Sequence, residues 1–248
     1  MILLVDIGNT RVKWRLLDKA LKFIGCGALV NDELNLEYIS SNFDNMTISH
    51  IYIANVASDS MSVWFEDLAH EKRAKLRKLS SQAAMLNIKL KYKNINNLGV
   101  DRSLALVGAF EGEGMLVIDA GSAITADYLN GKGEYLGGYI VPGLEMSRNL
   151  LISKTAKVGV FADIGADQPG LSTNECVNNG VVVMFRALVS GFISVAEAKG
   201  IDKFVITGGD GELFQMWSDD RLEYCDNLVL DGLAKYCLSE SKFFLESQ

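Results

Sequence analysis

One short pattern occurs twice in this chain, once in each half. It consists of an apolar run, an aspartate, one further residue, a glycine and a small polar residue, as in LLVDIGNT at residues 3–10 and LVIDAGSA at residues 116–123. A glycine turn after a strand lets the backbone approach a ligand closely, and successive N–H groups in such a turn can bind an anion. The repeat therefore predicts a protein built twice around phosphate-binding turns, with a nucleotide in a cleft between the two halves.

The amino-acid composition limits the class of protein and the kinds of partner that we expect. The 248 residues are 49% hydrophobic and include only two prolines, which is typical of a compact globular protein with one large domain or two small ones. The net charge of −7 argues against a nucleic-acid partner, because such proteins normally carry basic surface that neutralises phosphates. With only two histidines, a His-ligated metal or a Ser-His-Asp hydrolase is not expected, and a general base would be a carboxylate.

The sequence also bears on location. The apolar run at residues 1–5 is too short for a secretory signal, and nothing approaches the ~18 consecutive apolar residues of a membrane span. The four cysteines show no Cys-x-x-Cys spacing, and we interpret them as buried free thiols in a reducing compartment. We therefore expect a cytoplasmic protein with no membrane partner.

Hydrophobic periodicity predicts an α/β protein in which strands and helices mix in both halves. The Ser172-Thr-Asn-Glu175 segment fits a capping box at a helix start. The predicted strands are residues 2–6, 12–16, 51–56, 115–118, 125–129, 136–141 and 204–206, and the predicted helices are residues 60–79, 101–111 and 173–199.

The first turn has the groups that a nucleotide phosphate requires. Its backbone N–H groups and the Thr10 hydroxyl can bind phosphate oxygens, and Asp6 at the strand end can hold a hydrated Mg²⁺. Lys13 can reach a phosphate as well. The alternative is an ordinary hairpin turn in which the aspartate bonds its own backbone and Lys13 is a solvated strand lysine.

The second turn repeats this chemistry, and a third glycine-rich segment follows it. Ser122 supplies a hydroxyl for phosphate and Asp119 a ligand for a cation, although a second ordinary hairpin is the alternative. Residues 207–211 (TGGDG) follow a short apolar strand, and their glycines can let a base and ribose lie against the backbone. A flexible strand–helix connection is the alternative there.

An acid and a guanidinium stand side by side at a predicted helix start. Asp101 can accept a proton from a substrate hydroxyl, and Arg102 can bind a substrate carboxylate in a bidentate manner. Since aspartate is also a preferred helix N-cap, Asp101 at this position can be purely structural.

Taken together, these motifs resemble type III pantothenate kinase. They occur in that family's order from residue 6 to residue 210. The resemblance implies the actin-like ATPase fold, with ribonuclease-H-like halves at residues 1–114 and 115–248 and an ATP cleft between them. The motifs are Asp6-x-Gly-Asn-Thr, Gly99-x-Asp-Arg, Asp119-x-Gly-Ser-Ala-x-Thr, Gly137-Gly-x-Ile-x-Pro-Gly143, Thr173-x-Glu and Thr207-Gly-Gly-Asp.

The resemblance also implies an activity. The family phosphorylates pantothenate on its terminal hydroxyl with ATP, giving 4'-phosphopantothenate in the first step of coenzyme A biosynthesis. By position, Asp101 is the proton acceptor and Asp119 the metal ligand. The implied ATP-binding residues are Asp6, Ile7, Gly8, Asn9, Thr10, Arg11, Val12, Lys13 and Ser122, and the implied pantothenate-binding residues are Tyr92, Gly99, Val100, Asp101, Arg102 and Thr173.

Cofactors and assembly follow from the same resemblance. It implies Mg²⁺ with ATP, a monovalent cation (K⁺ or NH₄⁺) at Asp119, and a homodimer in which Thr173 reaches pantothenate across the interface. Thr173 can also belong to the helix cap. Ser122 stands where the family usually has threonine, so the hydroxyl is kept and a methyl group is lost.

Two other functions remain open from the sequence. One is a kinase of the same fold that acts on another carboxylate-bearing acceptor, which the Gly99-x-Asp-Arg motif would also suit. The other is a non-catalytic regulatory accessory protein, since relatives of the family have been interpreted as accessory factors for transcription.

Overall fold

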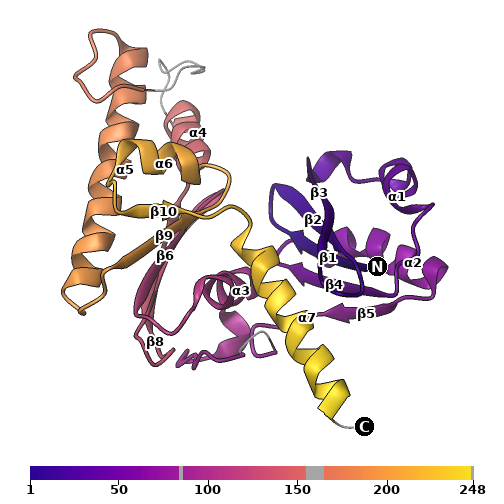
Figure 1. The fold of residues 1–248 in the computed structure, drawn as a ribbon. Helices are drawn as coiled ribbons and strands as arrows, with labels where there is room; N and C mark the ends of the chain where they lie inside the picture. Colours follow the sequence, from indigo (N-terminus) through magenta and orange to yellow (C-terminus); the bar gives the residue numbers. More distant parts are fainter. Residues whose placement is uncertain (84–85, 155–164, 247–248) are drawn as a thin grey trace. The chain divides into compact units, whose positions relative to one another are not determined.

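The computed structural model describes residues 1–83, 86–154 and 165–246, without the side chains of residue 40 and of residues 241–246 (Figure 1). The chain forms two compact units: unit 1 is Met1–Phe110 with Asn227–Gln248, and unit 2 is Glu111–Asp226. This division differs from the predicted boundary at residue 115. The final segment belongs to unit 1 because its helix α7 (Leu228–Glu246) packs along α3 (Val100–Ala109).

Unit 1 contains a five-stranded sheet in the order β3-β2-β1-β4-β5. The first three strands pair antiparallel, whereas β4 pairs parallel with β1 and β5 parallel with β4. The predicted hairpin of the first two strands is therefore confirmed. The strands are β1 (Ile2–Ile7), β2 (Arg11–Leu17), β3 (Phe23–Val30), β4 (His50–Asn55) and β5 (Lys75–Lys78).

Unit 2 contains a second five-stranded sheet with the same topology. Its order is β10-β9-β6-β7-β8, so the first strand is again central, with the second and third strands antiparallel on one side and the fourth and fifth parallel on the other. The prediction of an α/β protein built twice is confirmed. The strands are β6 (Met115–Ala120), β7 (Ala123–Leu129), β8 (Tyr135–Pro142), β9 (Lys203–Thr207) and β10 (Leu222–Tyr224).

The remaining helices connect these strands. Unit 1 has short 3₁₀ helices as well as α-helices, and unit 2 contains the long α5. The elements are η1 (Asn31–Glu33), α1 (Leu36–Phe43), η2 (Asp59–Ser62), α2 (Val63–Lys72), η3 (Ile95–Asn97), α4 (Leu144–Lys154), α5 (Thr173–Glu197) and α6 (Gly211–Trp217).

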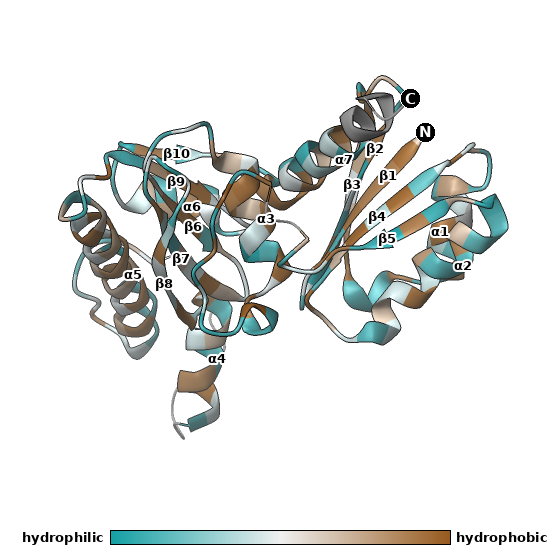
Figure 2. Cartoon of the chain, turned by 90° about the horizontal axis from the view of Figure 1, so that it is seen from below, coloured by the Kyte–Doolittle hydropathy of each residue, from teal (hydrophilic) through white to brown (hydrophobic). Residues whose placement is uncertain are grey.

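The core of unit 1 follows the two-residue period of its strands. Leu3, Val5 and Ile7 of β1 are fully buried in one cluster with side chains of α1 and α2, including Phe43 and Phe65. The strand β1 is correspondingly hydrophobic along most of its length (Figure 2). Helix α7 contacts β1 and β4, so the central strands are buried from more than one side.

The core of unit 2 is closed by α5. Phe185, Val189 and Phe192 of this helix are buried against β6, and the Phe185 ring meets the Phe214 ring edge-on with 5.0 Å between centroids. Among the described residues, α5 is the one helix long and apolar enough to cross a membrane by length and composition. A core helix meets the same criterion, and the packing of α5 against its sheet is that of a core helix.

The predicted helix at residues 60–79 is wrong at its C-terminal end. Helix α2 ends at Lys72, because Arg73 adopts a left-handed conformation (φ 51°) and its N–H closes the last turn on the carbonyls of Ala69 and His70. The following residues form β5, which pairs with β4. Pairing with β4 therefore determines the structure of this short charged segment. The helical pattern of its sequence does not.

The four cysteines are free, in agreement with their spacing. Their predicted burial is wrong for two of them, since Cys26 and Cys176 are exposed, whereas Cys237 is buried. In the case of Cys26, the side chain is exposed on the edge strand β3.

Candidate functional site

The first predicted phosphate turn joins β1 to β2 in unit 1. Three residues, Gly8, Asn9 and Thr10, lie between the strands, and the Gly8 N–H donates to the Arg11 carbonyl at 3.0 Å. Asp6 is half-buried near the end of β1, directly opposite Lys13 in the antiparallel register. Cross-strand partners of opposite charge stabilise such a pair, so the hairpin holds an acid and a base beside the turn.

Asn31 holds this turn from the end of the edge strand β3. Its side-chain Nδ2 donates to the carbonyls of Gly8 (3.0 Å) and Asn9 (2.9 Å), and its backbone N–H donates to the Thr10 carbonyl (3.0 Å). Asn31 is not among the residues predicted from the sequence. A lone asparagine after a strand belongs to no motif, and its contacts span more than twenty residues.

The second predicted turn joins β6 to β7 in unit 2. Only Gly121 and Ser122 lie between the strands, and the Gly121 N–H donates to the Ala123 carbonyl at 3.1 Å. Here the Gly143 N–H, at the end of β8, donates to the Ser122 carbonyl at 3.0 Å. Gly143 must lack a side chain, because a Cβ there would overlap the Gly121 carbonyl oxygen and lie 2.6 Å from that of Ser122.

The third predicted segment lies against the second turn. Gly208 has φ +96°, and a Cβ on it would overlap the Ala120 carbonyl and lie 2.5 Å from Asp119 Oδ1. The Asp210 N–H donates to the Ala120 carbonyl at 2.9 Å. Because β6 and β9 are parallel neighbours, their C-terminal ends meet at one edge of the sheet. Unit 2 therefore brings residues 119–122 and 207–211 together.

Asp101 lies in the first turn of α3, but it is not the N-cap. The N-cap is Gly99, which offers no side chain, so the structural alternative of Asp101 as an N-cap is wrong. Asp101 Oδ1 accepts a hydrogen bond from the Arg102 N–H at 2.8 Å. A Cβ on Gly99 would overlap the same carboxylate oxygen, so the glycine makes room for this orientation of Asp101.

The start of α3 lies close to the first turn within unit 1. A Cβ on Gly99 would be 3.7 Å from Val56 Cγ1, and the Val56 N–H donates to the Ile7 carbonyl at 3.0 Å, next to Asp6. The Arg102 side chain is buried at 7% exposure. Unit 1 thus brings the first turn and the Gly99–Arg102 segment to the C-terminal ends of β1 and β4.

Tyr92 and Thr173 lie outside the strand-end turns and the start of α3. Tyr92 is half-buried in the irregular segment between β5 and η3. Thr173 is the exposed first residue of α5, and the cap is formed by Ser172 and Glu175 in the predicted capping box, which is confirmed. Thr173 therefore does not provide the cap itself.

The oxygen donors suit a hard cation held jointly with phosphate. Asp6 and Asp119 each lie at or near the C-terminal end of a central strand, and Asp119 pairs in register with Thr125 and Thr207. The described part of the chain contains no group of three or more His, Cys, Asp or Glu side chains that could hold a metal on its own. Such a donor set fits a cation that shares its coordination with a nucleotide and water.

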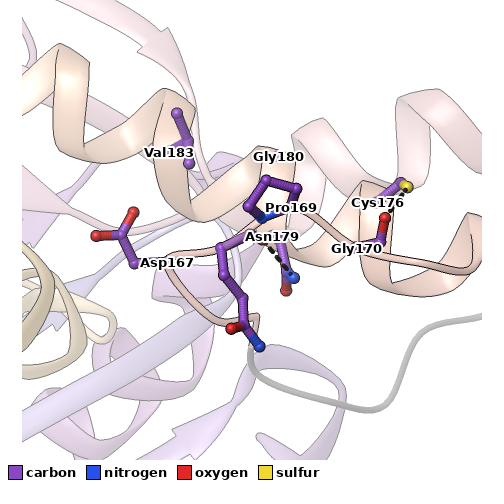
Figure 3. A pocket seen from close by; sticks show the side chains of 8 residues that line it. Asp167, Pro169, Gly170, Cys176, Asn179, Gly180 and Val183 are labelled. Carbon is purple, nitrogen blue, oxygen red and sulfur yellow. Dashed lines mark hydrogen bonds between the residues drawn. The ribbon is translucent and has the colours of Figure 1, made fainter.

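A separate cavity of about 390 Å³ lies beside α5 in unit 2 (Figure 3). Asn179 fixes its wall by donating from Nδ2 to the Gln168 carbonyl at 2.8 Å, and Cys176 Sγ donates to the Gly170 carbonyl at 3.2 Å. None of the residues of the three predicted loops lines it. The lining residues are Asp167, Gln168, Pro169, Gly170, Cys176, Asn179, Gly180 and Val183.

Comparison with known proteins identifies the family that shares these features. Residues 2–195 match the profile of the type III pantothenate kinase family. A type III pantothenate kinase from Marinobacter nauticus is 33% identical over 95% of this chain and 97% of its own length. Another, from Alcanivorax borkumensis, is 33% identical over 95% of this chain and 98% of its own length.

Solved structures share the fold at lower identity. A Campylobacter jejuni protein described as a Baf family transcriptional activator superposes with a TM-score of 0.66 at 24% identity, covering 97% of this chain and 99% of its own. The activator of 2-hydroxyisocaproyl-CoA dehydratase from Clostridium difficile, solved with bound ADPNP, gives 0.55 at 12% identity, covering 100% and 97%. These likenesses concern the fold alone, and they support the predicted fold of two related α/β halves.

Proposed function

The chain belongs to the type III pantothenate kinase family, and from that premise we propose how its residues transfer the γ-phosphoryl group of ATP to pantothenate. The family's activity is the ATP-dependent phosphorylation of pantothenate in coenzyme A biosynthesis. The observation that carries the residue assignment is the paired architecture: each unit places an Asp-x-Gly turn at the C-terminal end of its central strand.

We assign the ATP phosphates to the two turns. The segment from Asp6 to Lys13 would bind them through backbone N–H groups, the Thr10 hydroxyl and the Lys13 ammonium. Ser122 would add a hydroxyl from the second turn, in place of the family's usual threonine. The support is the exposure of Asn9, Thr10, Arg11 and Ser122, together with a backbone that is held in place by neighbouring strands.

We assign proton acceptance to Asp101. The oxygen of pantothenate's terminal hydroxyl attacks the γ-phosphorus, the bond from that phosphorus to the bridging oxygen breaks, ADP leaves, and the hydroxyl proton passes to the Asp101 carboxylate. The positioned carboxylate at the start of α3 supports this role. Arg102 would bind the pantothenate carboxylate, with Gly99, Val100, Tyr92 and Thr173 lining the substrate.

Two cations fit the donor set. Asp6 would hold Mg²⁺ together with the phosphates, and Asp119 would hold K⁺ or NH₄⁺. When bound, such cations neutralise the negative charge that is shared by the transferring phosphoryl group and the leaving ADP. The residues themselves supply the carboxylate and hydroxyl oxygens and fix their orientation at the strand ends.

We further propose a homodimer in the cytoplasm. Its support is the set of apolar side chains that unit 2 exposes on β8, α4 and α5, since exposed apolar surface of this kind marks association sites. These side chains are Tyr139, Ile140, Met146, Leu150, Leu151, Val183 and Met184. Light scattering on the purified protein tests the assembly.

The activity test is release of ADP from MgATP with and without pantothenate. We expect turnover that depends on pantothenate, and we expect Asp101→Asn to lower kcat by roughly 10²–10⁴, the usual contribution of a general base. Asp67→Asn on the exposed face of α2 is the matched control, because it makes the same change in unit 1 at an exposed position outside the proposed site. It should leave kcat unchanged.

The possible outcomes test the substrate assignment and the role of Asp101 separately. Folded protein without pantothenate-dependent turnover would reject the substrate assignment, and a panel of other carboxylate-bearing acceptors would follow. Pantothenate-dependent turnover with a near-normal kcat in Asp101→Asn would keep the activity and remove Asp101 from its role.

A further inference from the structure

We propose that Asn31 is a positioning residue for ATP, because its side chain and backbone together orient the first phosphate turn. The inference rests on the proposed assignment of that turn to the ATP phosphates. Asn31 lies outside every motif of the sequence, yet it engages three consecutive carbonyls of the turn, those of Gly8, Asn9 and Thr10.

The geometry of the peptide bond gives these contacts a consequence. The described residues contain no cis peptide bond. In a trans peptide the N–H of each residue points away from the carbonyl of the residue before it. Since Asn31 draws the carbonyls of residues 8, 9 and 10 to one side, the N–H groups of residues 9, 10 and 11 are directed to the other. Consecutive N–H groups on one side of a turn form an anion-binding surface.

Two donated hydrogen bonds fix the orientation of the Asn31 side-chain amide, and, among the described residues, this orientation leaves the amide oxygen unpaired. Within the described residues, its own oxygen Oδ1 is buried without a hydrogen-bond partner. A buried acceptor that is left unpaired opposes folding. The orientation of the Asn31 amide is therefore set by the two turn carbonyls to which it donates.

Unit 2 offers an internal comparison. Gly143 follows β8 as Asn31 follows β3, and its N–H bonds the Ser122 carbonyl just as the Asn31 N–H bonds that of Thr10. The backbone contact is thus common to both units. The second turn has two residues between its strands and the first has three, and Gly143 has no side chain that could hold a further carbonyl, so the side-chain contacts are particular to the first turn.

The test compares variants at Asn31 with the same changes at a second asparagine of unit 1. Asn31→Ala removes both side-chain donors and keeps the backbone bond, whereas Asn31→Asp keeps the shape, removes the donors and adds a charge. Asn42→Ala and Asn42→Asp are the matched controls, because Asn42 Nδ2 also donates to a carbonyl, that of Tyr38 at 2.8 Å, in the helix α1. Titration calorimetry gives the Kd for MgATP, and steady-state kinetics give the KM for ATP and for pantothenate.

We expect both Asn31 variants to raise the Kd and KM for MgATP about tenfold, which corresponds to the loss of two neutral hydrogen bonds. The KM for pantothenate should stay within twofold of the wild type, and both Asn42 variants should bind MgATP normally. A purely structural role would lower the melting temperature without separating the two KM values. Far-UV circular dichroism confirms that each variant is folded, and Asn31→Leu, which has a similar size, no donor and no charge, replaces Asn31→Ala if that variant is not folded.

Three results would overturn the inference: normal MgATP affinity in Asn31→Ala, weak binding in Asn31→Asp alone, or an equal loss for both substrates. The second of these would show charge repulsion in place of positioning. If the wild type binds MgATP but does not phosphorylate pantothenate, the proposed substrate fails while the Kd comparison still tests Asn31. If the wild type does not bind MgATP, the turn is not a phosphate site and this inference fails with it.

Discussion

The crossing of α3 and α7 depends on two glycines, and replacement of one of them by alanine gives a sharp test of the packing in unit 1. A Cβ on Gly232 would overlap the Leu104 carbonyl oxygen and lie 2.8 Å from its carbon and 2.9 Å from Leu104 Cα. All three atoms are backbone, so no side-chain rotation relieves the overlap. Gly108 faces α7 in the same way, against the Leu228 carbonyl.

The magnitude follows from two opposing terms. Forcing the two helices apart is an overpacking that costs about 1–3 kcal/mol. Because the overlapped atoms of Leu104 are all backbone, the cost lies in the upper part of this range, about 2–3 kcal/mol. Alanine in a helix interior is favoured over glycine by about 0.8–1 kcal/mol, so we expect Gly232→Ala to lower the free energy of unfolding by about 1–2 kcal/mol. The helix α3 carries Asp101, so kcat should fall as well.

Urea unfolding followed by tryptophan fluorescence measures the effect. Trp14 and Trp64 lie in unit 1 and Trp217 in unit 2, so a Trp217→Phe background makes the signal report unit 1. The control is Gly191→Ala in α5 of unit 2, where a Cβ would meet nothing within 4 Å. It is made without the Trp217→Phe change, so that Trp217 reports unit 2, and it is also followed by far-UV circular dichroism. Gly191→Ala should stabilise by about 0.8–1 kcal/mol. A Gly232→Ala protein as stable as the wild type would refute the proposed contact between the helices.

Two further predictions concern ions and pH. Replacing K⁺ by Na⁺ should lower kcat if Asp119 holds a monovalent cation, and equal rates in the two salts would reject that assignment. Burial, together with the hydrogen bond from Tyr52 to Glu240, raises the pKa of the Tyr52 phenol above its ordinary value of 10.0. Above pH 10 the unfolded chain therefore loses a proton that the folded protein keeps, and stability should fall as pH rises. The urea midpoint should drop between pH 9 and pH 11, and less steeply in Tyr52→Phe; identical slopes would remove Tyr52 from the explanation.

The sequence predicted the local parts of the site well. Both hairpins follow from an apolar run that stops at Asp6-x-Gly and Asp119-x-Gly, because strand propensity and turn chemistry are short-range properties. The cap at Ser172 and Glu175 was equally local and is confirmed. The proximity of the third loop to Asp119 required one further rule, that parallel neighbouring strands end at the same edge.

The contacts that could not be predicted are long-range. Asn31 meets the first turn only because β3 pairs with β2, and the return of α7 to α3 crosses more than one hundred residues of sequence. The buried face of α5 was also predicted only in part from the sequence. The spacing of apolar residues predicts one buried stripe on this helix, formed by Val177, Val181, Met184, Phe185, Leu188, Phe192 and Val195. In the structure Met184 is exposed and Val189 is fully buried, because a helix that is apolar on two sides has no single preferred face from its sequence.

Unit 1 consists of two segments that are separated in the sequence by unit 2, and this affects the order in which the units can fold during synthesis. Unit 2 is continuous in sequence, so all of its strands leave the ribosome before α7 does. Unit 1 must wait, with the α7-facing side of α3 uncovered, until its last helix has been synthesised. At synthesis rates of about 5–20 residues per second this interval lasts on the order of ten seconds. During that time the nascent chain exposes the Gly108 face to solvent and to chaperones, and we expect unit 2 to reach its native state first although it begins later in the sequence.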